Sequence, residues 1–331
     1  MLKIGLKPVF RVRANDQDIT RALQDNLISL NLTDEAGTKS DTLTLTLSDT
    51  APGYQLPKSG AKLELWLGYD DQAKNMGVFI VSDIELSGPP SQMTIKATAA
   101  PLSYNSQSFG QLQTQKTRSW DHVSLGDMVR TIAKEQGLKP EVAERFSTIN
   151  IPHIDQTSES DINLLSRMAK DHDALVKPVA GRLLFTDKSK GKTAGGKSLP
   201  VINLVPGDIG TWKVSMTDRS KYASVTTRWQ DVNTGEEKTV TAGEGNPTLK
   251  ITHPYPDRQA ADAAAKSRYQ SLQRGASRLS ITCPGSPELF AEGGLSLKGF
   301  RSGVDGEWIM TRVTHTLDGN GYSSRVEGES R

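Results

Sequence analysis

The sequence predicts a β-rich α+β protein in which two β domains flank an inserted helical segment. Residues 42–48 read Thr-Leu-Thr-Leu-Thr-Leu-Ser, the alternation of a half-buried strand. From Ser119 onward the apolar residues recur with the 3.6-residue period of a helix, and from Ala174 onward strand patterns return. We therefore expect a first β-barrel domain at residues 1–115, a helical segment at 116–172 and a second β domain at 173–331.

Turn signals divide the first domain into short strands that fit a small antiparallel barrel. The breaks are Pro52-Gly53, Pro57 and Pro89-Pro90. The expected strands are residues 9–13, 27–32, 42–48, 62–68, 78–86 and 93–97.

The helical segment has explicit start and stop signals. Apolar residues from Leu125 to Ala133 lie on one helix face, Ser124 and Asp127 have the spacing of an N-cap, and Gly137 suits a left-handed C-cap. The same pattern predicts a second helix that starts at residues 158–161 and runs through Ala169.

The C-terminal part predicts a second β domain with one packed helix. The alanine-rich run at residues 257–274 has high helix propensity. The expected strands are residues 174–178, 182–186, 224–230, 238–242, 277–282, 295–298, 308–317 and 322–327.

Composition excludes several classes of protein. The 331 residues carry a net charge of only +2, which argues against a dedicated nucleic-acid binder, and no apolar run is long enough for a membrane anchor. The single Cys283 excludes an intrachain disulfide or a Cys-based zinc site, and we expect it to be buried. The N-terminus lacks the apolar core of a secretory signal, so we expect synthesis and retention in the cytoplasm.

One motif suggests a nucleotide hydrolase. Residues 191–198, Gly-Lys-Thr-Ala-Gly-Gly-Lys-Ser, match the P-loop pattern letter for letter. The chemistry also requires a helix to follow, whereas Pro200 and the apolar run at 201–205 predict a strand. We interpret the lysines at 188, 190, 192 and 197 as a solvated surface loop without the aromatic residues that stack on bases.

No residue pattern selects a catalytic or metal site. The histidines lack metal-ligand spacing, although His153 with Asp155, and His172 with Asp171 and Asp173, could place carboxylates beside imidazoles. A carboxylate pair of the kind that glycosidases use stays open, because nothing in the sequence singles one out. We expect no catalytic residue, cofactor or metal.

The middle of the chain resembles a known family. Trp120 and Leu125-Gly126-Asp127 are followed by Gln156, Ser160-Asp161, Leu165, Arg167 and the turn at Gly181, in an order that resembles the late control protein D family of contractile-tailed phages. The stretch from Gln156 to Arg167 is also similar to the spike proteins of type VI secretion. This resemblance covers about a fifth of the chain directly, and the β-rich flanks have the family's layout.

The resemblance implies a structural role rather than catalysis. Members are homotrimeric baseplate hubs in which two similar β-barrel domains per chain form a pseudo-sixfold ring between a hexameric tail tube and a trimeric spike. The implied partners are the tail tube protein, the tail spike protein, baseplate wedge proteins and the tape measure protein. The implied location is the bacterial cytoplasm during assembly and then the baseplate of a phage tail or of a tailocin of the R-type pyocin kind.

Two alternatives remain at this point. Residues 120–140 also resemble the peptidoglycan-binding LysM module, so a cell-wall-binding or cell-wall-degrading tail component is the second hypothesis. Type VI relatives carry the spike on the same chain, whereas this sequence ends at Arg331 after a strand, and we expect it to recruit a separate spike.

Overall fold

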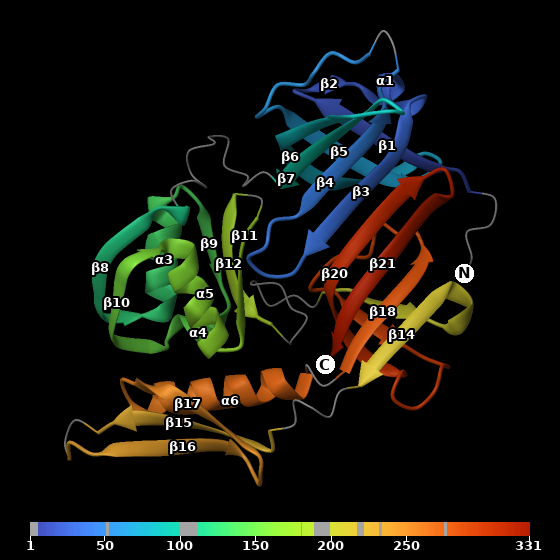
Figure 1. Cartoon of the computed structure of the whole chain (residues 1–331). Helices are drawn as coiled ribbons and strands as arrows, with labels where there is room; N and C mark the ends of the chain where they lie inside the picture. The colour runs from blue at the N-terminus through green and yellow to red at the C-terminus, as the bar shows by residue number, and fades with distance from the viewer. Residues whose placement is uncertain are drawn as a thin grey trace. The chain divides into compact units, whose positions relative to one another are not determined.

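The computed structural model describes residues 6–50, 53–99, 112–179, 181–188, 199–216, 222–231, 234–274 and 277–331 (Figure 1). The chain forms two compact units, and each unit combines separate stretches of the sequence. Unit 1 contains Met1–Ala100, Val201–Val214 and Leu279–Gly328, and unit 2 contains Pro101–Pro200, Ser215–Arg278 and Glu329–Arg331. The protein is β-rich with few helices.

The first part of unit 1, here called the N-terminal lobe, is an antiparallel arrangement of strands. Its elements are β1 (Pro8–Ala14), β2 (Gln17–Asp18), α1 (Thr20–Gln24), β3 (Leu27–Glu35), β4 (Thr42–Ser48), β5 (Lys62–Tyr69), β6 (Gln72–Ser87) and β7 (Gln92–Ala99). The predicted alternation in β4 is confirmed, because Leu43, Leu45 and Leu47 are at most 1% exposed and lie in the core of this lobe.

The second part of unit 1, here called the C-terminal lobe, has its own apolar core around Ile281, Leu295 and Val313. Its elements are β13 (Val201–Leu204), the 3-10 turn η1 (Pro206–Asp208), β14 (Thr211–Met216), β18 (Ser277–Pro284), β19 (Gly294–Leu297), β20 (Gly306–Asp318) and β21 (Gly321–Ser330). Cys283 lies in this core and is 5% exposed, as expected.

Both lobes belong to one sheet. β20 pairs antiparallel with β3, with Leu317 opposite Leu30, and this joins the lobes in a 13-stranded sheet. The sequence pattern assigned these strands to two separate β domains, at residues 1–115 and 173–331. In the structure, strands almost 300 residues apart share hydrogen bonds instead, a long-range pairing that no local pattern encodes.

The middle segment of unit 2 combines helices with strands. Its elements are β8 (Gln115–Ser124), α3 (Leu125–Glu135), β9 (Lys139–Val142), α4 (Glu144–Ser147), β10 (Asn150–Ser160), α5 (Asp161–Asp171), β11 (Ala174–Val179) and β12 (Arg182–Asp187). β10 pairs antiparallel with β8, while β11, β12 and β9 form a second small sheet.

The predicted helix signals are confirmed. The Ser124 Oγ accepts a hydrogen bond from the Asp127 amide at the start of α3, and Gly137 has a φ of +66° beyond its end. The description of residues 116–172 as helical needs a correction, since β8 and β10 were not predicted. Charged and amide side chains interrupt the apolar residues on their inward faces, so the apolar alternation that marks a strand is incomplete.

The remaining part of unit 2 is a three-stranded sheet with a helix packed on it. Its elements are β15 (Ser224–Gln230), β16 (Glu237–Gly243), β17 (Thr248–Tyr255) and α6 (Arg258–Arg274). Ala261 and Ala264 of α6 pack with Tyr255 in a small core, so the predicted helix at 257–274 is confirmed.

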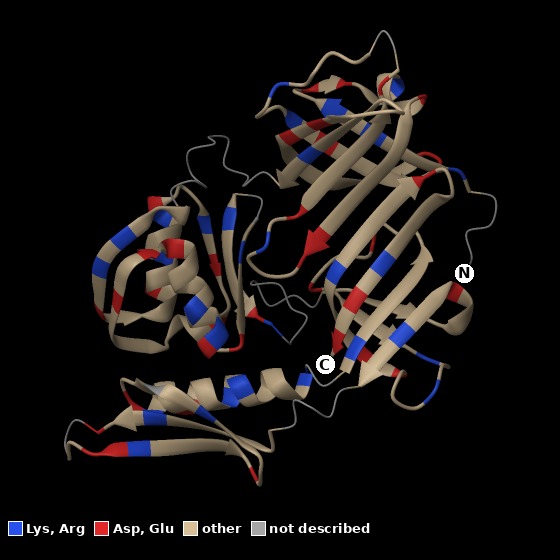
Figure 2. Cartoon of the chain, in the orientation of Figure 1, with Lys and Arg blue, Asp and Glu red and all other residues tan. Residues whose placement is uncertain are grey.

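The charge distribution, the P-loop-like motif and the helices bear on the classes of protein that the sequence argues against. Acidic and basic residues are interspersed over both units, in keeping with the low net charge (Figure 2). The P-loop-like residues 191–198 lie outside the described residues. None of the helices described has both the length and the apolar character that crossing a bilayer would demand.

Candidate functional site

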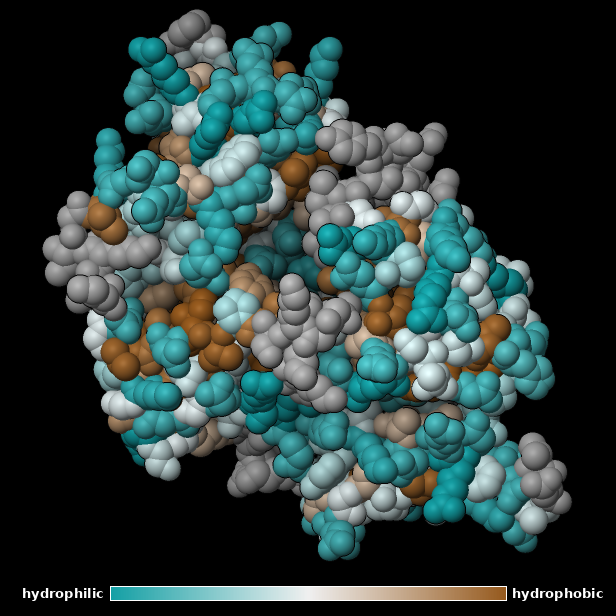
Figure 3. All heavy atoms as spheres, turned by 180° about the vertical axis from the view of Figure 1, so that it is seen from behind, coloured by the Kyte–Doolittle hydropathy of each residue, from teal (hydrophilic) through white to brown (hydrophobic). Residues whose placement is uncertain are grey.

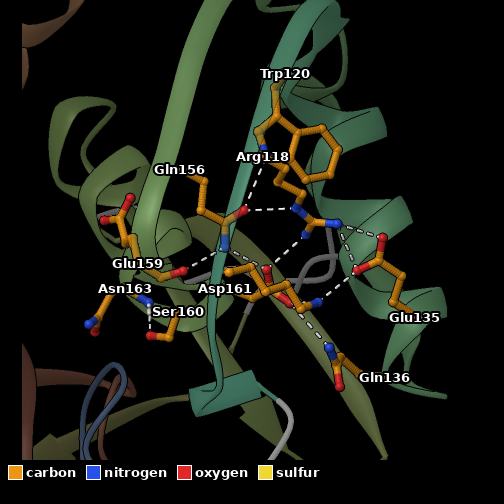
Figure 4. A network of polar contacts seen from close by, with 10 residues as sticks. Arg118, Trp120, Glu135, Gln136, Gln156, Glu159, Ser160, Asp161 and Asn163 are labelled. Carbon is orange, nitrogen blue, oxygen red and sulfur yellow. Dashed lines mark hydrogen bonds and ion pairs between the residues drawn. The ribbon is translucent and has the colours of Figure 1, made fainter.

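Three of the residues that carry the family resemblance, Trp120, Gln156 and Asp161, meet in a buried network in unit 2. Asp161, the first residue of α5, is 0% exposed. Its Oδ1 accepts hydrogen bonds from Arg118 Nη2 and Gln156 Nε2, each at 2.8 Å, as Figure 4 shows. Its Oδ2 accepts from Lys116 Nζ at 2.6 Å and from Gln136 Nε2 at 3.1 Å. Four donors, from β8, from the residue that caps the C-terminus of α3 and from β10, therefore meet on one carboxylate.

Gln156 completes this network from β10. Its side chain is 0% exposed, and its Oε1 accepts from Arg118 Nε at 2.9 Å and from Trp120 Nε1 at 3.3 Å. Its Nε2 also donates to the Glu159 carbonyl at 2.9 Å. The amide is used at both ends, so any residue without both a donor and an acceptor would leave buried groups unpaired.

Lys116 and Arg118 carry two positive charges and Asp161 one negative charge. Glu135, at the end of α3, supplies the second negative charge. It accepts from Arg118 at 2.7 Å and from Lys116 at 3.0 Å. Burial acts to raise the pKa of Glu135, but the hydrogen bonds from these two cations outweigh it and the pKa is lowered. For Lys116, burial acts to lower the pKa, and the bonds to Asp161 and Glu135 reverse the effect and raise it. The charged forms of Lys116 and Glu135 are thus each stabilised by their partners in the network.

The aromatic ring of Trp120 forms one side of the network. The Arg118 guanidinium lies over the ring, 4.3 Å from its centroid, and Trp120 itself is 8% exposed. Stacking on this ring and the hydrogen bond from the Arg118 Nε to Gln156 Oε1 together fix the Arg118 side chain in the orientation that reaches Asp161.

Other motif residues shape the helix starts and the apolar core. Leu125 and Leu165 are 0% exposed in the core of this segment. Ser160 caps α5 by accepting from the Asn163 amide at 3.4 Å, and Asp127 accepts from Ser124 and Arg130. Gly126 lies against α4, where an added Cβ would come 2.7 Å from the Ser147 Cα, so only glycine fits.

Arg167 and Gly181 also lie outside the network. Arg167 pairs with Glu159 at 2.7 Å on the exposed side of α5, and Gly181 occupies the turn between β11 and β12 with a φ of +72°. Sequence reasoning also missed four network members, which are Lys116, Arg118, Glu135 and Gln136. Lys116, Arg118 and Trp120 recur at every second position, a signal that identifies one face of a strand once β8 is recognised.

The network holds the segment together and has no catalytic arrangement. A carboxylate that receives four hydrogen bonds in a closed interior is not free to take up or release a proton from a substrate. In the described part of the chain no three His, Cys, Asp or Glu side chains are placed to hold a metal ion.

The histidine and carboxylate pairs raised by the sequence do not form a buried site. His153 contacts Asp121 at 2.6 Å and Asp155 at 3.3 Å, but all three side chains are more than half exposed. Asp173 instead forms a buried ion pair with Arg274.

Comparison with a family model and with a curated relative gives the same description, a baseplate hub protein. The model of a family described as phage tail baseplate hub (GPD) matches residues 42–321. A protein of Escherichia phage 186 described as a probable baseplate hub protein is 33% identical, across 98% of this chain and 93% of that protein.

Solved structures share the fold at low sequence identity. The 43 kDa tail protein of prophage MuSo2 from Shewanella oneidensis has a TM-score of 0.73 at 14% identity, over 98% of both chains. An Escherichia coli protein described as a type VI secretion component has a TM-score of 0.53 at 9% identity, over 92% of this chain and 74% of that one.

Proposed function

This chain belongs to the phage tail baseplate hub family, and from that premise we propose that it works as a homotrimer joining a hexameric tail tube to a trimeric central spike. It is a structural component of the phage baseplate. The comparisons do not favour the alternative of a cell-wall-binding or cell-wall-degrading component.

The feature that best supports the trimer proposal is the pair of β lobes in unit 1. Each lobe has its own apolar core, and the two share one sheet through β3 and β20. A trimer of such chains would present six β lobes in a ring, which suits contact with a hexameric tube on one side and a threefold spike on the other. We propose that each lobe acts as one barrel of that ring.

Exposed apolar side chains on the C-terminal lobe also support this proposal. Val201, Val205 and Trp212 are 43%, 46% and 45% exposed, and they belong to β13, the residue before η1, and β14. Figure 3 shows hydrophobic residues gathered on the back of the molecule. Exposed apolar side chains such as these are typical of a surface that another protein covers.

Further parts of the proposal concern partners and location. We propose that the tail spike and tail tube proteins bind the trimer directly, and that wedge proteins and the tape measure protein complete its surroundings. Assembly would take place in the bacterial cytoplasm, and the finished particle would be a phage tail or a headless tailocin. Metals and cofactors have no part in this role.

Native mass spectrometry of the purified chain, alone and with its spike and tube proteins, tests the proposal. We expect a trimer, either alone or on addition of the spike. The Trp212→Glu variant should reduce the trimer fraction, because it places a charge in the apolar surface. Leu86→Glu, at a residue that is 56% exposed in the N-terminal lobe, is the matched control and should leave the mass unchanged.

A chain that stays monomeric with both partners present would contradict the trimer proposal. A trimer that tolerates Trp212→Glu would keep the proposal and exclude this part of the surface from the interface. Circular dichroism on each variant separates either result from misfolding.

A further inference from the structure

Unit 2 contains a groove that the Asp161 network does not use. A cavity of about 690 Å³ lies between residues 149–154 of β10 and its preceding loop, the C-terminal half of α5, β17 and the N-terminal half of α6. This volume is within the range of about 300 to 1,000 Å³ that is usual for ligand sites. All of its lining residues belong to unit 2.

The walls of the groove are mainly apolar. Leu249 and Ile251 come from one face of β17, Met168 from α5, and Ala260 and Ala263 from α6. α6 packs mostly on β15 and β16, which leaves this face of β17 to form a wall. The two sides are held in place by a hydrogen bond from Ser267 Oγ to the Lys170 carbonyl at 2.7 Å.

A strand edge forms the opposite wall. β10 pairs only with β8 in its two-stranded sheet, so within the described residues its other edge has no strand partner. Alternate residues of a strand point to opposite faces, so six consecutive residues, 149–154, can line one cavity only if the strand presents its edge. Backbone groups at such an edge bind extended polypeptide segments. Pro152 has no N–H, so at that position this edge can offer only its carbonyl to any segment that pairs with it.

The charges at the rim favour an anionic ligand. Lys170 and Arg268 line the groove, and neither forms an ion pair among the residues that the structure describes. Two carboxylates also line the groove: Asp171 accepts from the Tyr255 hydroxyl at 3.4 Å, and Asp257 accepts from the Ala260 amide at 2.8 Å. With Arg167, three basic residues face these two acidic ones, so the lining carries a small excess of positive charge. Figure 2 shows basic residues along α6.

His172 adds no charge to the groove near neutral pH. Burial, with a contribution from Arg145, lowers its pKa to about 4. The two side chains that can attract a carboxylate are therefore Lys170 and Arg268.

We propose that this groove binds an extended segment of a partner protein in which apolar side chains alternate with carboxylate-bearing ones. In an extended segment, alternate side chains point to opposite sides, so one set would pack on Leu249 and Ile251 and the other would reach Lys170 and Arg268. The inference rests on the proposed function only in taking the partner to be another component of the tail.

Fluorescence anisotropy with two synthetic peptides tests this inference on the full chain. One fluorescein-labelled peptide of roughly eight residues alternates leucine with glutamate, a length matched to the lining strand, and the second has lysine in place of each glutamate. We expect the acidic peptide to bind about tenfold more tightly than the basic one.

Three variants locate the binding. Ala263→Trp fills the groove and should abolish binding. The double variant Lys170→Glu with Arg268→Glu should reverse the preference between the peptides. Lys266→Glu is the matched control on the same helix, since Lys266 does not line the groove and pairs with Asp262, and it should leave both affinities unchanged.

Several results would overturn the proposal. The proposal fails if the two peptides bind equally, or if binding survives Ala263→Trp. It also fails if oleate displaces the acidic peptide at a lower concentration than unlabelled peptide does. The last result would make the groove a fatty-acid site. The mass of the same samples is measured in parallel, so failure of peptide binding and failure to form a trimer are read separately.

Discussion

The N-terminal lobe and the Asp161 network are stabilised in different ways. In the lobe, apolar side chains from several strands, such as Leu45 of β4 and Leu65 of β5, share the burial. In the network, one carboxylate receives hydrogen bonds from four side chains. Loss of one lobe residue removes one contact surface among many, whereas loss of Asp161 leaves Arg118 and Lys116 with Glu135 as the one carboxylate that both contact among the described residues.

The largest effect is therefore expected for Asp161→Ala. Arg118 and Lys116 are only 25% and 28% exposed, so removal of Asp161 should leave their charges poorly compensated. We expect a loss of about 3 to 4 kcal/mol in the free energy of unfolding of this segment. Hydrogen exchange of the α3 and α5 amides measures it locally.

Asp155→Ala is the matched control for that variant. Asp155 of β10 accepts from Ser119 of β8 and pairs with His153 of β10, but it is 58% exposed, so the expected loss is much smaller than for Asp161→Ala. Equal losses of unfolding free energy for Asp161→Ala and Asp155→Ala would show that burial does not make the network bonds more stabilising than exposed ones.

Leu45→Ala tests the other side of the comparison. Leu45 is 1% exposed, and its truncation should cost about 3 kcal/mol through lost burial and the cavity that remains. Denaturant unfolding gives the free energy. Leu86→Ala, at a residue that is 56% exposed in the same lobe, should change it by less than about 0.5 kcal/mol. A small effect of Leu45→Ala would mean that the lobe relaxes around the cavity.

Buried histidines should make both units sensitive to acid. His315 of β20 is 0% exposed, with Nδ1 2.9 Å from Ser324 Oγ and Nε2 3.2 Å from the Leu289 carbonyl. Burial lowers its pKa from 6.5 to about 4, against a smaller opposing effect of the Leu289 carbonyl. The unfolded chain thus binds a proton at higher pH than the folded chain. The stability that comes from keeping His315 buried and neutral is therefore complete above pH 6.5, and it is lost as the pH falls towards 4.

The expected loss over that interval is at most about 3 kcal/mol. It is measured as the free energy of unfolding against pH for the wild type and for His315→Gln, which cannot take up the proton. His172→Gln in unit 2 is the comparison variant, since burial also lowers the pKa of His172 to about 4. An unchanged pH dependence in His315→Gln would contradict the assignment.

The smallest effect is expected at the start of α3. Ser124→Ala removes the hydrogen bond that its Oγ accepts from the Asp127 amide at 3.0 Å, and the loss should be about 1 kcal/mol. Thermal unfolding measures it. Ser119→Ala on the same strand is the control, because its hydroxyl bonds only to the exposed Asp155 side chain. A larger effect for Ser119→Ala would indicate that the cap does not determine the helix start.

The sequence predicted the elements whose signals are local. The alternation in β4, the Ser124 cap and the alanine-rich run of α6 each lie within a few neighbouring residues, and each was confirmed. β8 and β10 were missed because Lys116, Arg118 and Gln156 interrupt the apolar residues on their inward faces. The β3 and β20 pairing was missed because register between distant strands depends on the tertiary fold.

The candidate site was predicted in part for the same reason. The resemblance singled out Trp120, Gln156 and Asp161, which the structure brings together. Their partners Arg118 and Gln136 come from other parts of the segment, and no spacing in the sequence relates the residue that caps α3 to the first residue of α5.

The number and position of copies in an assembled tail test the central claim most directly. A tag inserted in the chain, located by electron microscopy of purified particles and quantified by mass spectrometry, gives both. The hub account predicts about three copies per particle, one for each subunit of the spike, at the junction of tube and spike. Absence from the particle, or a sixfold arrangement along the tube, would contradict it.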